Sequence, residues 1–195
     1  MGSATDSIAQ AAARLVVDDG LEYGAAKRKA ARDLSRRHGR RSDLPSNEAV
    51  EDEVRDYLSL FQADTQPGEL RVLRELALRW MERLQPFRPY LAGAAWRGTA
   101  TRRSALQIEL YCDDPKAAEI ALLDQRVLFE PVGQPDGPDV LRVDATCTEL
   151  GTNVAIFLHV LDLDDLRGAL KPDARGRTWR GDGPALQRLV QAETP

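Results

Sequence analysis

Apolar residues recur at helical spacing through the first part of the chain, in four successive segments. The segments cover residues 6–19, 21–38, 47–61 and 67–84. Thr5 or Asp6 is the expected N-cap of the first helix, and Ser46–Asn47 forms the cap of the third. Gly39 and Pro86 are the expected stops of the second and fourth helices. The pattern therefore predicts a helical front to the protein.

The later part of the chain alternates between apolar and polar positions, which is typical of strands with one buried face. The alternation is clearest over Leu106–Tyr111. The other expected strands are Tyr90–Ala92, Val127–Pro131, Val140–Thr148 and Asn153–Leu161. A helix from Pro115 to about Gln125 interrupts them, with Leu122 and Leu123 packing inward. We therefore predict an α+β fold, in which an N-terminal helical region precedes a mixed β-sheet with helices packed on one face.

Three regions follow from this reading of the chain. Residues 1–66 are the helical region, residues 67–165 the α/β domain, and residues 166–195 a basic loop with a short helix. Within the last region, Lys171–Gly183 is rich in glycine and arginine and is expected to be a surface loop before a helix at Pro184–Gln191. An alternative is that Arg175, Arg177 or Arg180 in this loop contacts phosphate.

Composition narrows the class of protein. The 195 residues carry a formal net charge of −4, with 43% apolar and 30% charged residues, which suits a soluble globular protein. No apolar run approaches the roughly 20 residues that cross a bilayer, and no basic and apolar leader opens the sequence. We expect a cytoplasmic protein without a membrane partner. Cys112 and Cys147 lie in apolar runs and are expected to be buried free thiols.

The second predicted helix carries a basic face, and the sequence leaves two interpretations of it open. Its basic residues are Lys27, Arg28, Lys29, Arg32, Arg36 and Arg37, followed by Arg40 and Arg41. One interpretation is a phosphate-binding face for nucleic acid, carried by the first four of these residues. The other is a solvated face that balances the acidic third helix, within the molecule or across a homodimer. The acidic residues of that helix are Glu48, Glu51, Asp52, Glu53 and Asp56, expected on its exposed face.

The stretch Pro89–Asp114 runs from a short apolar segment through Gly93 and a Gly/Thr-rich segment into the alternating strand. It resembles the signature of the nucleotidyltransferase superfamily with the polymerase-beta-like fold. In that signature a glycine–serine turn precedes a strand with two aspartates two residues apart. The resemblance implies that the turn lets backbone N–H groups approach nucleotide phosphates. It also implies that the paired aspartates and a third carboxylate from a neighbouring strand hold two Mg²⁺ ions for phosphoryl transfer.

The turn matches the signature residue by residue. Gly93 takes the place of its first glycine, Ala94 that of the serine, Arg97–Gly98 that of the second glycine, and Ser104 precedes the position of the first aspartate. The phosphate-binding residues that the resemblance implies are Gly93, Ala94, Arg97, Gly98, Thr99, Arg102, Arg103, Ser104 and Gln107.

The carboxylates of the signature match less well. Ala105 and Gln107 stand at the aspartate positions, and a register shifted by two uses Gln107 and Glu109. At most one carboxylate remains on that face, whereas Mg²⁺ demands hard oxygen ligands in near-octahedral geometry. The third carboxylate of the family would be Asp144 or Asp162. Asp162 is the expected cap of a short helix that starts at Leu163. The resemblance therefore implies a degenerate metal site, with Mg²⁺ as cofactor only if the protein is active.

Over most of residues 8–180 the chain also resembles a family of proteobacterial nucleotidyltransferase-like proteins. The motifs that carry this resemblance are Tyr23–Ala31, Leu44–Asn47, Pro86–Leu91, Gly98–Thr101 and Ser104–Tyr111.

Three hypotheses follow for the function. The first is a non-catalytic protein that binds nucleotide or nucleic acid. The second is an active, metal-dependent nucleotidyltransferase that uses Glu109 with Asp144 or Asp162. The third is a scaffold for protein interaction or homodimerisation. The spacing of Cys112, Cys147 and His159 matches no zinc motif, and His159 is expected to be structural.

Overall fold

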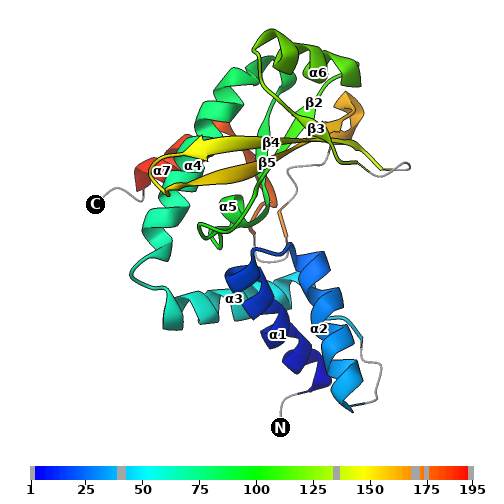
Figure 1. The fold of residues 1–195 in the computed structure, drawn as a ribbon, viewed down its shortest axis with the longest axis vertical. Coiled ribbons are helices and arrows are strands. Elements are labelled where there is room, and N and C mark those ends of the chain that lie inside the picture. Colours follow the sequence, from blue (N-terminus) through cyan, green and yellow to red (C-terminus); the bar gives the residue numbers. More distant parts are fainter. Residues whose placement is uncertain (1–2, 39–42, 134–136, 168–171, 174–175, 193–195) are drawn as a thin grey trace. The chain divides into compact units, whose positions relative to one another are not determined.

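The structure is a computed structural model that describes residues 3–38, 43–133, 137–167, 172–173 and 176–192 (Figure 1). These residues form two compact units. The first contains the described residues up to Gly68 together with Thr99–Ser104, and the second contains Glu69–Gly98 and the described residues from Ala105 onward. All β-strands that the structure describes lie in the second unit.

The first unit is a helical cluster made of α1 (Ala4–Asp19), α2 (Tyr23–His38) and α3 (Asn47–Phe61). Helix α1 packs against both of the others. The buried residues of the cluster are small and aliphatic, namely Ile8, Ala9, Ala12, Ala13, Val16, Val17, Ala26, Ala30, Val50, Val54 and Leu58. Gly20 ends α1 in a left-handed conformation at φ 70°, and a Cβ there would overlap the carbonyl oxygen of Arg103. The alanines and this glycine let the backbones approach closely.

Two details of this unit differ from the expectation. The N-cap of α1 is Ser3, earlier than predicted, and it forms a capping box with Asp6. Glu51 was expected on the exposed acidic face of α3, but it is fully buried. Its carboxylate accepts a hydrogen bond from Nη2 of Arg55 at 2.8 Å, one helical turn later. An arginine at this spacing allows an acidic residue to turn inward, because the charge stays paired.

The second unit is built on a mixed sheet of six strands in the order β3-β4-β5-β2-β1-β6. The strands are β1 (Tyr90–Ala92), β2 (Leu106–Tyr111), β3 (Glu130–Pro131), β4 (Asp139–Cys147), β5 (Thr152–Leu161) and β6 (Arg180–Asp182). Strands β2 and β5 pair in parallel, and every other pairing in the sheet is antiparallel. The α+β class with a mixed sheet is therefore confirmed.

The sheet buries one face. Its apolar rows are formed by register partners such as Ile108 on β2, Leu158 on β5 and Leu141 on β4, each at most 1% exposed. Helices α4 (Gln66–Arg83) and α6 (Pro115–Asp124) form a helical layer beside the sheet. In the view of Figure 1, α4 lies behind the β4–β5 hairpin. The 3-10 turns η1 (Gln85–Phe87) and η2 (Leu163–Leu166) and the helix α7 (Gly183–Ala192) complete the unit. The opposite face carries the polar members of the same strands.

Three predicted elements differ from the structure. Residues after Gly93 form a one-turn helix, α5 (Gly93–Arg97), where a turn was expected. Buried Arg74 of α4 holds this helix, because its Nε donates to the carbonyl of Ala95 at 2.9 Å. Arg180–Asp182 is a strand and not part of a surface loop. The strand expected over Val127–Pro131 is only two residues long.

Smaller differences concern single side chains. Leu123 was expected to pack inward but is 62% exposed, whereas Leu122 is buried. Both cysteines are free thiols, and only Cys147 is fully buried. Three predictions concern residues outside the described ones, namely Gly39 as a helix stop, Arg40–Arg41 as part of the basic face and Arg175 as a phosphate contact. None of the helices that the structure describes is long and apolar enough to cross a membrane.

Candidate functional site

The glycine turn and the central strand are neighbours in the second unit. Strand β1 ends at Ala92, whose register partner on β2 is Gln107. Gly93 follows in a left-handed conformation at φ 67°, and a Cβ at this position would lie 3.0 Å from Cγ of Gln107. Any larger residue at this position would therefore be strained and crowded at once. The two parts of the predicted signature meet at the polar face of the sheet.

The first polar pair on this face joins two parallel strands. Nε2 of His159 on β5 lies 2.6 Å from Oε1 of Gln107 on β2, so the imidazole donates to the amide oxygen. Burial lowers the pKa of His159, and the nearby carboxylate of Glu109 acts in the opposite direction. The imidazole is therefore held neutral to lower pH than a solvated histidine.

The second polar group on this face surrounds Glu109. The hydroxyl of Tyr111 donates to Oε2 of Glu109 at 2.7 Å, and Nη1 of Arg180 donates both to the same carboxylate oxygen and to the Tyr111 hydroxyl. The Glu109 side chain is 14% exposed and that of Arg180 is 24% exposed. Burial raises the pKa of Tyr111, and its hydrogen bond to Glu109 raises it further. The three side chains, here called the Glu109 cluster, consist of the Glu109–Arg180 ion pair and the Tyr111 hydroxyl hydrogen-bonded to both members.

The two other candidate carboxylates lie away from this cluster. The register partner of Glu109 is His159, which in turn pairs with Val140 on β4. Asp144 is four residues further along β4, so its backbone lies roughly 13 Å along the strands and about 10 Å across them from Glu109. Its carboxylate accepts from Nη2 of Arg142 at 3.0 Å.

Asp162 follows the end of β5, and its carboxylate accepts the backbone N–H of Asp164 at 2.8 Å. It caps η2, in the way the sequence predicts. Among the described residues, no three His, Cys, Asp or Glu side chains are grouped so that they could hold a metal ion.

The residues predicted to bind phosphate are divided between the two units. Gly93–Gly98 and Gln107 lie in the second unit, and Thr99–Ser104 lies in the first. Arg97 is only 7% exposed and pairs with Asp173, Nη1 to Oδ2 being 3.3 Å. Its guanidinium also stacks on the ring of Trp179, 4.3 Å from the centroid. The guanidinium of Arg97 is therefore held inside the second unit by Asp173 and Trp179.

In the first unit, the Thr99–Ser104 segment binds helices. Thr99 Oγ1 lies 3.1 Å from the hydroxyl of Tyr23, and Nη1 of Arg103 donates to the carbonyl of Asp18. Ser104 accepts the backbone N–H of Thr101 at 3.0 Å, which closes the turn. Arg102 is exposed. The segment therefore contacts helices α1 and α2 of the first unit.

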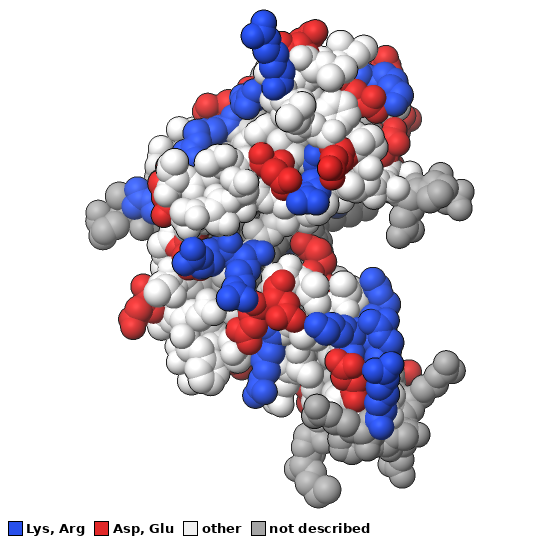
Figure 2. All heavy atoms as spheres, viewed as in Figure 1, with Lys and Arg blue, Asp and Glu red and all other residues white. Residues whose placement is uncertain are grey.

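Helix α2 presents part of its basic face to solvent, and Figure 2 shows the Lys and Arg side chains gathered over it. Lys27 donates to the carbonyl of Pro45 at 3.1 Å and to Oδ1 of Asn47 at 2.7 Å. Lys29 pairs with Asp19 at 3.1 Å. Arg28 and Arg32 are exposed. Two of the four predicted nucleic-acid contacts therefore serve the helical cluster itself.

Sequence reasoning missed the role of two side chains of the site. Tyr111 was read only as a polar strand position, and Arg180 only as a loop cation. A tyrosine two residues after Glu109 shares its sheet face, so the alternation of β2 could have predicted that Tyr111 lies beside Glu109. Nothing near Arg180 indicates its partner, because 71 residues separate it from Glu109.

Comparison with known proteins adds little to this geometry. No protein-family model matches the chain, and no curated protein matches it. Two solved structures of the Cid1 poly(U) polymerase are similar to part of it, one bound to MgGTP and one a variant bound to MgATP. Both have a TM-score of 0.35, at 14% and 13% identity, and cover 50% of this chain. The match spans 32% of the polymerase chain. The fold class therefore stands on the helices and strands described above.

Proposed function

We propose that this protein binds a nucleotide beside Gly93, on the polar face of its sheet, without efficient metal-assisted transfer. One observation carries the proposal: the single carboxylate of the central strand on this face, Glu109, is already paired with the guanidinium of Arg180. A guanidinium at this place supplies the positive charge that a divalent cation supplies in a metal-dependent transferase.

The neighbouring positions support the same reading. Gln107 offers one neutral amide oxygen, and that oxygen accepts from His159. The same-face positions of the adjacent parallel strand are Phe157 and His159, so β5 adds no carboxylate beside Glu109. Two Mg²⁺ ions would meet a single, already neutralised carboxylate. An approaching divalent cation would also be repelled by Arg180.

A nucleotide phosphate suits this environment better than a metal ion. Nε of Arg180 is buried and has no hydrogen-bond acceptor among the residues that the structure describes. A phosphate oxygen is a strong acceptor for such a donor. The lack of a side chain at Gly93 lets the turn backbone lie close to Gln107, because a Cβ there would be 3.0 Å from Cγ of Gln107.

The test is a calorimetric titration with ATP, GTP, CTP and UTP, each with Mg²⁺ and with EDTA. We expect one nucleotide to bind with an affinity that changes less than about threefold when the metal is removed, a difference under 1 kcal/mol. Binding that requires Mg²⁺, with turnover lost in Glu109→Gln, would instead establish the active transferase. Absence of nucleotide affinity together with a stable dimer would establish the scaffold.

A pair of glycine variants locates the binding. Gly93→Ala places a methyl group 3.0 Å from Cγ of Gln107, so the Gln107 side chain must shift and nucleotide binding should weaken. Gly151→Ala is the matched control, since Gly151 has φ 64° and a Cβ there meets no atom within 4 Å. Both variants carry the same left-handed backbone penalty, of about 1 kcal/mol. Equal loss of binding in both variants, or in neither, would refute the assignment to Gly93.

A further inference from the structure

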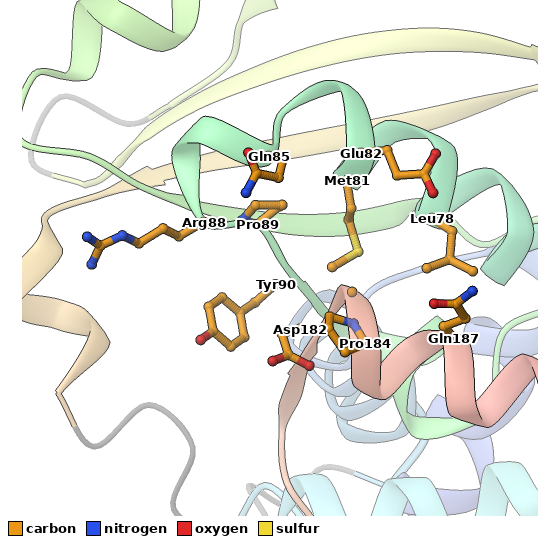
Figure 3. A pocket seen from close by; sticks show the side chains of 11 residues that line it. Leu78, Met81, Glu82, Gln85, Arg88, Pro89, Tyr90, Asp182, Pro184 and Gln187 are labelled. Carbon is orange, nitrogen blue, oxygen red and sulfur yellow. The ribbon is translucent and has the colours of Figure 1, made fainter.

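A cavity in the sheet unit borders the Glu109 cluster at Tyr90, whose ring centroid lies 5.6 Å from that of Tyr111. Its volume is about 400 Å³, within the range of small-molecule sites. It is enclosed by the end of α4, the η1 turn, the start of β1, the end of β6 and the start of α7. In Figure 3 the labelled side chains of Leu78, Met81, Tyr90 and Pro184 border a common space. No function proposed above uses it.

The cavity has an apolar centre. Met81, which is 2% exposed, and Leu78 come from α4, and Pro184 faces them from α7. The ring of Tyr90 forms another side of the space (Figure 3). Such a surface favours an aliphatic or aromatic body, because burying it removes apolar area from water on both partners.

The charge beside this apolar centre is negative. Asp182 on β6 is the register partner of Tyr90 on β1, so their Cβ atoms lie about 5 Å apart on one face of the sheet. Oδ1 of Asp182 accepts the backbone N–H of Ala185 at 2.9 Å, which fixes the orientation of the carboxylate. Glu82 adds a second carboxylate at the rim, and the guanidinium of Arg88 extends away from the cavity (Figure 3).

The backbone at Arg88 determines where Tyr90 stands beside the cavity. Arg88 adopts φ 47° at the end of η1, a left-handed conformation that costs a non-glycine residue about 1–2 kcal/mol. The conformation turns the chain from η1 into β1, and Tyr90 follows two residues later.

We propose that this cavity binds a small organic cation, an amine with an apolar body. The ammonium group lies between the Asp182 carboxylate and the face of the Tyr90 ring, and the body packs on Met81, Leu78 and Pro184. A carboxylate and an aromatic ring together attract an ammonium group through charge pairing and the ring quadrupole. The ligand class is distinct from the nucleotide proposed for the Gly93 side of the sheet.

The experiment uses phenethylamine, with phenethyl alcohol and hydrocinnamate as neutral and anionic counterparts of similar size. The chain has two methionines, Met1 and Met81, so an isotope-labelled methionine methyl signal reports directly on the cavity. We expect phenethylamine to shift the Met81 signal with a dissociation constant on the order of 1 mM. The alcohol and the acid should bind at least tenfold more weakly.

Three variants of the full chain test the location and the charge. Gly183 lines the cavity, and a Cβ there meets no atom within 4 Å, so Gly183→Leu should fill the space and abolish amine binding. Gly68→Leu is the control, because Gly68 also has open space around it and lies outside the cavity. Asp182→Asn keeps a capping oxygen for α7 and should weaken amine binding at least tenfold.

Each possible result either supports or contradicts amine binding in this cavity. Tighter binding of hydrocinnamate than of phenethylamine would show that the cavity takes an anion. Unchanged amine affinity in folded Gly183→Leu would show that the amine binds elsewhere. Equal affinity of Asp182→Asn and the parent chain would remove the carboxylate from the recognition. Selective loss in Gly183→Leu and Asp182→Asn, with Gly68→Leu unaffected, would support the inference.

Discussion

Gly181 in the middle of β6 is the position at which a single methyl group should do most damage. It pairs with Leu91 of β1, and its side-chain direction points at the indole of Trp96 on α5. A Cβ there would overlap three ring carbons, the farthest of them, Cζ2, at 2.5 Å. Ordinary contacts of a Cβ begin near 3.4 Å, so the ring or the strand must move by about an ångström.

The ring of Trp96 cannot move without losing other interactions. Its Nε1 donates to the carbonyl of Thr178 at 2.9 Å, which ties α5 to the segment before β6. Overpacking costs roughly 1–3 kcal/mol, and a lost hydrogen bond costs about 1 kcal/mol more. We therefore expect Gly181→Ala to lower the free energy of unfolding by about 2–4 kcal/mol.

The assay is urea denaturation followed by tryptophan fluorescence, with Gly183→Ala as the matched control. Gly183 lies two residues further on and has open space for a Cβ, so its alanine variant should stay within about 0.5 kcal/mol of the parent or be slightly more stable. Equal stability of the two variants would contradict this expectation, since the difference between them rests only on the Trp96 ring.

Two further predictions concern the polar face. Arg180→Gln leaves Glu109 partly buried without its counter-ion and should cost on the order of 2 kcal/mol, less than the roughly 3–5 kcal/mol of a fully buried pair. The Arg180→Gln, Glu109→Gln double variant should recover most of this loss in denaturant titrations, and strict additivity would contradict the pairing. Because burial lowers the pKa of folded His159 below its ordinary 6.5, the unfolded chain takes up a proton first as pH falls through that value. Stability should therefore fall as the pH drops below about 6.5, and His159→Gln should flatten this decline.

Local features of the sequence specify most of the helices and strands. The apolar stripe of α4 and the alternation of β2 and β5 each extend over enough residues to define a buried face. Capping residues mark the N-termini of helices, as Ser46 does for α3 and Asp114 for α6, because a short polar side chain accepts a backbone N–H of the first turn. These features depend on neighbours a few positions apart, so a sequence displays them directly.

The site needed the tertiary structure. Strand β6 has only three residues, too few to show an alternation. Its identity as a strand depends on pairing with β1, and that pairing alone brings Arg180 to Glu109. The cavity beside Tyr90 likewise requires α4, β1, β6 and α7 to converge.

The difference between the features that the sequence specifies and those that only the folded structure decides has a physical reason. Periodicity and capping are properties of a continuous segment, so the amino-acid sequence by itself determined the α+β class, most of the buried face of the long elements and the shortage of carboxylates on β2. Strand partners and the neutralisation of a charge are settled between segments far apart along the chain. Only the folded arrangement therefore decided that Glu51 turns inward and that the carboxylate of Glu109 pairs with a guanidinium.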